Sequence, residues 1–163
     1  MSEWFNESMT QSRDMLLRLL IVVLSLGGLA DALYFTFAYY GRIRKARWVP
    51  EIFCAREGSS CVTVVRTPYA RVFGVPNSLL GIVYYVLLVV WIVIVPHHLS
   101  LSGHVLRPFE SLGLVLLGAS LCTVVLGFYL IYALRRVLYT DCPLCYTAHA
   151  INLALFVLLI LMS

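Results

Sequence analysis

The sequence is short of charge. Only 12% of its 163 residues are charged, while 61% are hydrophobic. A soluble globular domain has about 25% charged and 45–50% apolar residues. The mean hydropathy of the chain is +0.91. This composition excludes an ordinary soluble protein and indicates an integral membrane protein.

Other features are missing as well. The sequence has no internal repeat, no low-complexity tract and no segment that resembles a nucleic-acid-binding module. Its first fourteen residues, MSEWFNESMTQSRD, lack the basic start and short apolar core of a cleaved signal peptide. Each helical crossing needs about 20 residues, so the length allows about four spans and one sizeable loop. We therefore expect residues 1–163 to form a single integral membrane domain.

Four apolar runs predict the membrane spans. They cover approximately residues 15–40, 78–95, 109–138 and 143–162. Helices are expected because a backbone in lipid must satisfy its own hydrogen bonds. The expected fold is an all-α bundle of four transmembrane helices. The long loop 41–76 has an apolar and aromatic second half, Val62–Phe73, which predicts a short helix lying on the membrane surface.

Polar residues at the span boundaries carry further expectations. In "GVPNS", Pro76 marks a turn, and Asn77 or Ser78 is expected to cap the second span. Asp31 lies inside the first span. An ionisable residue there is a candidate for function by default, although it can also face the bundle or pair with a neighbour.

Four of the five cysteines are expected on one side of the membrane. The first and third loops of a four-span protein share a face, and these loops carry Cys54, Cys61, Cys142 and Cys145. Cys122 falls in the middle of the third span. Cysteine is among the most buried residue types, so we expect Cys122 to be a small buried apolar residue.

The stretch "TDCPLCYTAHA", Thr140–Ala150, combines several reactive features. Pro143 suits a first helical turn, which puts Asp141 or Cys142 at or near the helix cap. A helix N-terminus and a Cys-X-X-Cys spacing both favour the reactive thiolate. His149 follows Cys145 by four residues and therefore shares its helical face. We expect both side chains to point into one pocket.

Three interpretations of the cysteines are open at this point. Two pairs on one face suggest electrons passing from pair to pair by thiol–disulfide exchange. Four cysteines can instead hold a structural zinc ion, although C-x6-C is long for one half of such a site. The pairs could also be static disulfides in a transporter or channel, although few intramembrane polar residues are available for a conduit.

Basic residues concentrate on the cysteine face. Nine lie there and three on the side of the termini. The nine are Arg42, Arg44, Lys45, Arg47, Arg56, Arg66, Arg71, Arg135 and Arg136, against Arg13, Arg18 and Arg107. The positive-inside rule predicts that the cysteine face and loop 41–76 are cytoplasmic, with the termini outside. Disulfide chemistry favours the opposite orientation, because disulfides usually persist outside the cytoplasm.

The chain resembles the vitamin K epoxide reductase family of quinone-linked thiol oxidoreductases. The resemblance rests on a loop cysteine pair, then "RTPYARVFGVPNSLLG" (Arg66–Gly81), then "CPLC" at the start of the last helix. It implies a membrane thiol:quinone oxidoreductase that oxidises a thioredoxin-fold partner in trans and draws on the respiratory quinone pool. The cofactor would be a quinone such as menaquinone or ubiquinone, with no metal.

The resemblance also implies residue roles. Cys145 would meet the quinone, Cys142 would be its partner, Cys61 would relay, and Cys54 would exchange with the thioredoxin-like protein. Asn77 would donate a hydrogen bond to one quinone oxygen, and the pocket wall would include Val65, Tyr69 and Phe73. His149 stands where animal members typically carry tyrosine. We expect no fused thioredoxin-like domain, and the loop between the first two spans lacks the longer insertion of animal members, which favours a microbial enzyme. Its basic cysteine face resembles inverted archaeal relatives.

Overall fold

The computed structural model describes residues 2–42, 60–72, 74–94 and 103–162. Four long helices dominate it, with a group of short elements between the first two. The long helices are α1 (Ser2–Tyr39), α3 (Asn77–Ile94), α4 (Gly103–Arg136) and α5 (Pro143–Met162). The short elements are α2 (Ser60–Val65), the 3-10 helix η2 (Pro68–Ala70), β1 (Arg71–Val72) and β2 (Val75–Pro76).

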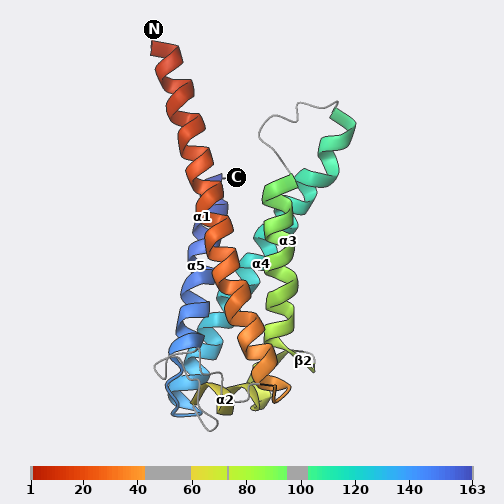
Figure 1. Cartoon of the computed structure of the whole chain (residues 1–163), viewed down its shortest axis with the longest axis vertical. Coiled ribbons are helices and arrows are strands. Elements are labelled where there is room, and N and C mark those ends of the chain that lie inside the picture. Colours follow the sequence, from red (N-terminus) through yellow and green to blue (C-terminus); the bar gives the residue numbers. More distant parts are fainter. Residues whose placement is uncertain (1, 43–59, 73, 95–102, 163) are drawn as a thin grey trace.

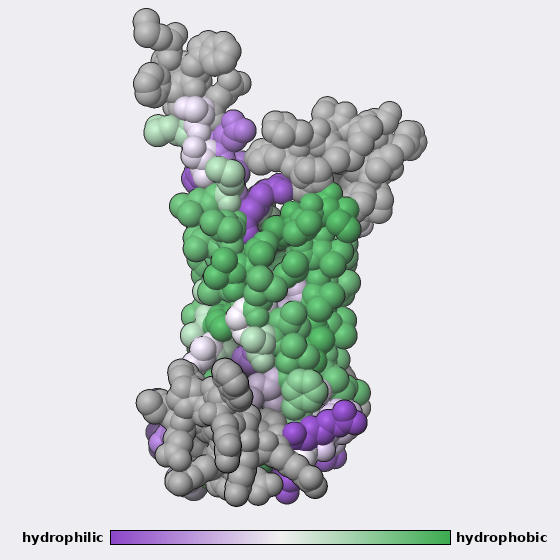
Figure 2. Space-filling model, viewed as in Figure 1, coloured by the Kyte–Doolittle hydropathy of each residue, from purple (hydrophilic) through white to green (hydrophobic). Residues whose placement is uncertain are grey.

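All four long helices contain a segment apolar enough to cross a membrane. These segments are Ser8–Tyr39, Asn77–Ile94, Ser111–Arg136 and Pro143–Met162. Apolar residues cover the midsection of the bundle, and hydrophilic residues gather toward its two ends (Figure 2). The chain is a multi-pass membrane protein, and the predicted four-helix bundle is confirmed.

Two helices extend further than the apolar pattern predicts. The helix of the first expected span, α1, begins at Ser2 rather than at Met15. The helix of the third expected span, α4, begins at Gly103. With 38 residues and a rise of about 1.5 Å per residue, α1 is much longer than a hydrocarbon core of about 30 Å. Hydropathy locates the part of a helix that crosses lipid, but polar residues can continue the same helix into water.

The bundle is built around α1, which packs against both α3 and α5, while α5 also packs against α4 (Figure 1). Ile21, Leu88 and Leu155 are fully buried between these helices. The close approach of α1 and α3 depends on Gly28, because a Cβ atom there would overlap the ring of Tyr85. Gly28 therefore lets the Tyr85 side chain lie directly against the α1 backbone.

The short elements close one end of the bundle, opposite the two termini (Figure 1). The strands β1 and β2 form an antiparallel hairpin in which Arg71 pairs with Pro76. Gly74 in the turn has φ +82°, a backbone conformation that glycine adopts without steric cost. The surface helix expected within Val62–Phe73 is observed as α2, which starts slightly earlier and ends at Val65.

Two contacts join the first span to the hairpin and to the start of α3. The guanidinium of Arg71 lies 5.4 Å from the ring centroid of Tyr39. The Thr36 hydroxyl donates a hydrogen bond of 3.0 Å to the hydroxyl oxygen of Ser78. The expected capping role of Asn77 or Ser78 is wrong, because both residues are already inside α3 and their side chains make other contacts.

Candidate functional site

Cys142 and Cys145 sit at the start of α5, which begins at Pro143. Cys142 therefore occupies the N-cap position, as one of the two expected cap residues. Its Sγ accepts a hydrogen bond of 3.3 Å from the backbone amide of Cys145. A disulfide joins the two cysteines, and Cys142 is completely buried. The local fold of the helix start thus holds this pair in place.

Cys61 comes from the first turn of α2 and lies beside this pair. Its Sγ is 3.0 Å from the Sγ of Cys142, and its side chain is also completely buried. Cys61 is itself disulfide-bonded. The expectation that the loop and helix cysteines share one face is met for these three residues, while Cys54 lies outside the described residues.

Cys122 does not behave as expected. It is the free cysteine among the described residues, and its side chain is exposed on α4. The inward face of α4 at this level carries Ser120, which is fully buried. The prediction of a buried Cys122 was wrong because apolar side chains in a membrane protein can face lipid as readily as the core.

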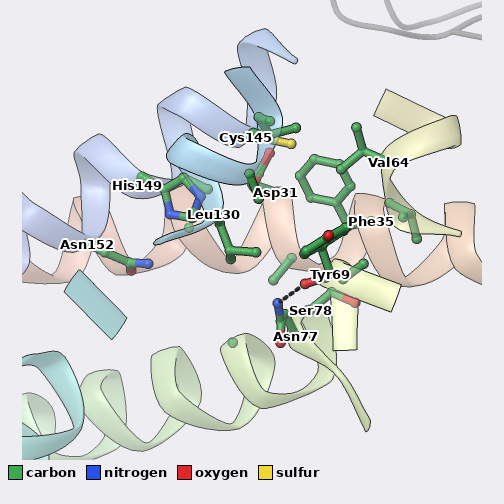
Figure 3. Close-up of a pocket in the computed structure, with 18 of the residues that line it drawn as sticks. Asp31, Phe35, Val64, Tyr69, Asn77, Ser78, Leu130, Cys145, His149 and Asn152 are labelled. Carbon is green, nitrogen blue, oxygen red and sulfur yellow. Dashed lines mark hydrogen bonds between the residues drawn. The ribbon is translucent and has the colours of Figure 1, made fainter. Parts of the chain in front are cut away.

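A pocket with a cavity volume of about 160 Å³ lies beneath the disulfide, between the helices and the end group (Figure 3). Cys145 and His149 both line it, as their helical spacing predicted, and so do Val65, Tyr69 and Asn77, which the family resemblance implied. Phe73, the other expected wall residue, lies outside the described residues.

Several polar atoms of the residues that line this largely apolar pocket have no hydrogen-bond partner among the described residues. The Nδ2 of Asn77 donates a hydrogen bond of 3.3 Å to the Tyr69 carbonyl. Asn77 Oδ1, His149 Nδ1 and Asp31 Oδ1 are buried and have no hydrogen-bond partner within the described part of the chain. Buried polar atoms in proteins are normally hydrogen-bonded. Asn77 and Asp31 both line the pocket, and the lack of partners for their oxygens favours a site that is completed by a polar ligand.

The imidazole of His149 lies against the backbone of Gly127, which has no side chain. A Cβ atom on Gly127 of α4 would be 2.9 Å from the Nδ1 of His149. A larger residue at position 127 would therefore push the imidazole out of its present place. The packing of α4 on α5 thus holds the ring at the wall of the pocket.

The sequence did not predict the part of the pocket that lies further along α5. There the Tyr85 hydroxyl donates a hydrogen bond of 2.7 Å to the Oδ1 of Asn152, and both residues line the pocket. A signal for Asn152 was present, because Cys145, His149 and Asn152 follow a helical spacing of four and three residues. Tyr85 carried no comparable signal, since it is the packing of α3 against α1 that brings it there.

Comparison with known proteins supports the expectation drawn from the motifs. A search of curated proteins found no match. The family model described as "Vitamin K epoxide reductase family" matches residues 19–160. The matched region contains the polar pocket residues, Cys61 and the disulfide at the start of α5. It covers most of the sequence, and the chain therefore belongs to the vitamin K epoxide reductase family.

Proposed function

We propose that this protein is a membrane thiol:quinone oxidoreductase that oxidises a thioredoxin-fold partner and passes the electrons to a bound quinone. Family members are membrane oxidoreductases that use quinones. The whole chain would act as one catalytic domain. Electrons would travel from the partner to Cys54, then through Cys61 and Cys142 to Cys145.

One observation carries this proposal. The Sγ atoms of Cys61 and Cys142 are 3.0 Å apart, and the disulfide partner of Cys142, Cys145, lines the pocket. Thiol–disulfide exchange requires a thiolate to reach the sulfur of a disulfide. Reduction of the bond that holds Cys61 would leave a thiolate beside Cys142, and its attack would release the thiol of Cys145 at the pocket wall.

The pocket fits a quinone head group. When bound, a quinone supplies a two-electron acceptor that also takes up two protons. The second Nδ2 hydrogen of Asn77 can be donated to one carbonyl, and His149 can donate to the other when the ring nitrogen that does not face Gly127 carries a proton. Val65 and Tyr69 would hold the ring, together with Phe73 as expected from the sequence.

The alternative is a membrane protein whose cysteines bind a metal or fix the fold. Within the described residues, no three side chains of His, Cys, Asp or Glu are placed to hold a metal ion. Zinc binds cysteine as the thiolate, and the sulfurs of Cys142 and Cys145 are bonded to each other. The unpartnered polar atoms around Cys145 favour the quinone enzyme over static disulfides.

A first test separates these two functions. Protein purified in mild detergent with its native lipids should contain bound quinone by extraction and chromatography, and no stoichiometric zinc by elemental analysis. Added quinone should also oxidise the reduced protein. Stoichiometric zinc without quinone would favour the alternative instead.

We also propose that the cysteine face is cytoplasmic and that both termini lie outside, because nine of the twelve basic residues are on the cysteine side. Alkaline phosphatase fused to the C-terminus should then be active in cells. A fluorescent protein at the same position should fluoresce only if the C-terminus is cytoplasmic. Fluorescence without phosphatase activity would show the opposite orientation.

A further inference from the structure

Asp31 is the acidic residue of the pocket, and the relay does not use it. It lies on α1 and lines the same pocket as Cys145 and His149 of α5. In Figure 3 its side chain extends from α1 toward the part of the pocket where these two residues lie. Its Oδ1 atom is buried without a hydrogen-bond partner among the described residues. A carboxyl group inside a span is costly and is commonly functional.

The surroundings of Asp31 do not supply a structural ion pair. No lysine or arginine is among the described residues that line the pocket. Small residues, Gly28 and Ala32, flank Asp31 on the α1 face that lines the pocket, and the ring of Tyr85 lies against Gly28. The titratable groups around it are Tyr34 of its own helix, Tyr69 of η2, Tyr85 of α3, and Cys145 and His149 of α5.

The proposed reaction needs a proton carrier in this place. Oxidation of the dithiol breaks two S–H bonds, forms one S–S bond, and delivers two electrons and two protons that become the two O–H bonds of a quinol. The pocket is largely apolar, so water is a poor carrier between the sulfur atoms and the quinone oxygens. A side chain that reaches both can accept a proton from one and donate it to the other.

We propose that Asp31 transfers a proton from the Cys142–Cys145 dithiol to an oxygen of the bound quinone. This inference rests on the proposed function. The carboxylate accepts a proton as the disulfide forms, gives it up as an O–H bond forms, and is back in its starting state after each turnover. Asn77 of α3 and His149 of α5 hold the quinone oxygens, while Asp31 reaches the same pocket from α1, where Cys145 also forms part of the wall.

The variant Asp31→Asn tests this role, because it keeps the size of the side chain and removes its acid–base function. The protein is first reduced with a phosphine, and one round of oxidation by a short-chain benzoquinone is followed by stopped-flow absorbance. We expect the rate to fall about 100-fold, within the usual range for general acid–base catalysis. Quinone affinity and the rate of disulfide reduction by dithiothreitol should stay unchanged. Asp31→Glu should recover part of the rate, and Asp14→Asn, on the same helix outside the pocket, should match the wild type.

A second readout does not depend on turnover. Infrared difference spectra of reduced against oxidised protein, recorded without quinone, should show a carboxyl band that Asp31→Asn lacks and Asp14→Asn retains. A wild-type rate in Asp31→Asn would overturn the role of Asp31 alone. A slower rate matched by an equal loss of quinone affinity or a lower melting temperature would also overturn it. Failure of the wild-type dithiol to react with quinone would instead overturn the proposed function, and this role with it.

Discussion

Replacing Cys145 with alanine should abolish quinone reduction, with a loss on the order of 10⁴-fold or more, the scale that follows removal of a reacting nucleophile. Cys145 is the member of the disulfide pair that lines the pocket. Without it, Cys142 cannot form the S–S bond whose formation releases two electrons. The rate of quinone reduction should be followed from the change in quinone absorbance, with dithiothreitol as the reductant.

Cys122→Ala is the matched control for this variant. Cys122 is exposed on α4 and is not among the residues that line the pocket. Its removal should therefore leave turnover and quinone binding unchanged. The Cys145→Ala protein should still bind quinone, because Asn77 and His149 remain. Full turnover by Cys145→Ala would contradict the role that we assign to this thiol.

Replacing Cys61 with alanine should also stop turnover, but at a different step. Cys142 is completely buried, and Cys61 supplies the sulfur 3.0 Å away from it. A partner thiol therefore has no direct route to the Cys142–Cys145 disulfide. Oxidation of a thioredoxin-fold protein should fall by about 10³-fold or more, as expected when a step that depends on an enzymic nucleophile is lost.

The Cys142–Cys145 pair and the quinone pocket should remain intact in Cys61→Ala. After reduction by a phosphine, the dithiol of Cys61→Ala should still reduce quinone once at the wild-type rate, which Cys145→Ala cannot do. Mass mapping should find the Cys142–Cys145 disulfide in the oxidised variant. If the partner is oxidised at the normal rate, electrons bypass Cys61, and the proposed order of the relay is incorrect.

The apolar runs were sufficient to predict the four-helix bundle, because lipid leaves a spanning backbone few alternatives. They located the crossings but not the helix ends, and α1 starts thirteen residues before the predicted Met15. The error for Cys122 has a related cause. Hydropathy identifies residues that avoid water, but it does not distinguish the lipid-facing side of α4 from the side that faces the core.

The family resemblance pointed to Val65, Tyr69 and Asn77, but residue spacing alone predicted the pocket only where its residues share a local pattern. Cys145 and His149 follow helical spacing on one element, so their common face could be inferred from the sequence. The contact between Tyr85 and Asn152 joins residues 67 positions apart, and no spacing rule reaches that far. The contact between the Gly127 backbone and His149 could not be predicted either, because it depends on how α4 and α5 pack.

The complete burial of Cys61 and Cys142 separates their sulfur atoms from small thiols in the surrounding solution. Small thiols of a reducing compartment would reduce an exposed disulfide without any benefit to a client protein. Enclosed sulfur atoms are insulated from that background, since exchange requires direct access to sulfur. In the proposed relay, this burial would let the protein keep an oxidising centre in a reducing compartment and take electrons through a selected entry point. Such insulation would matter most in the cytoplasmic orientation.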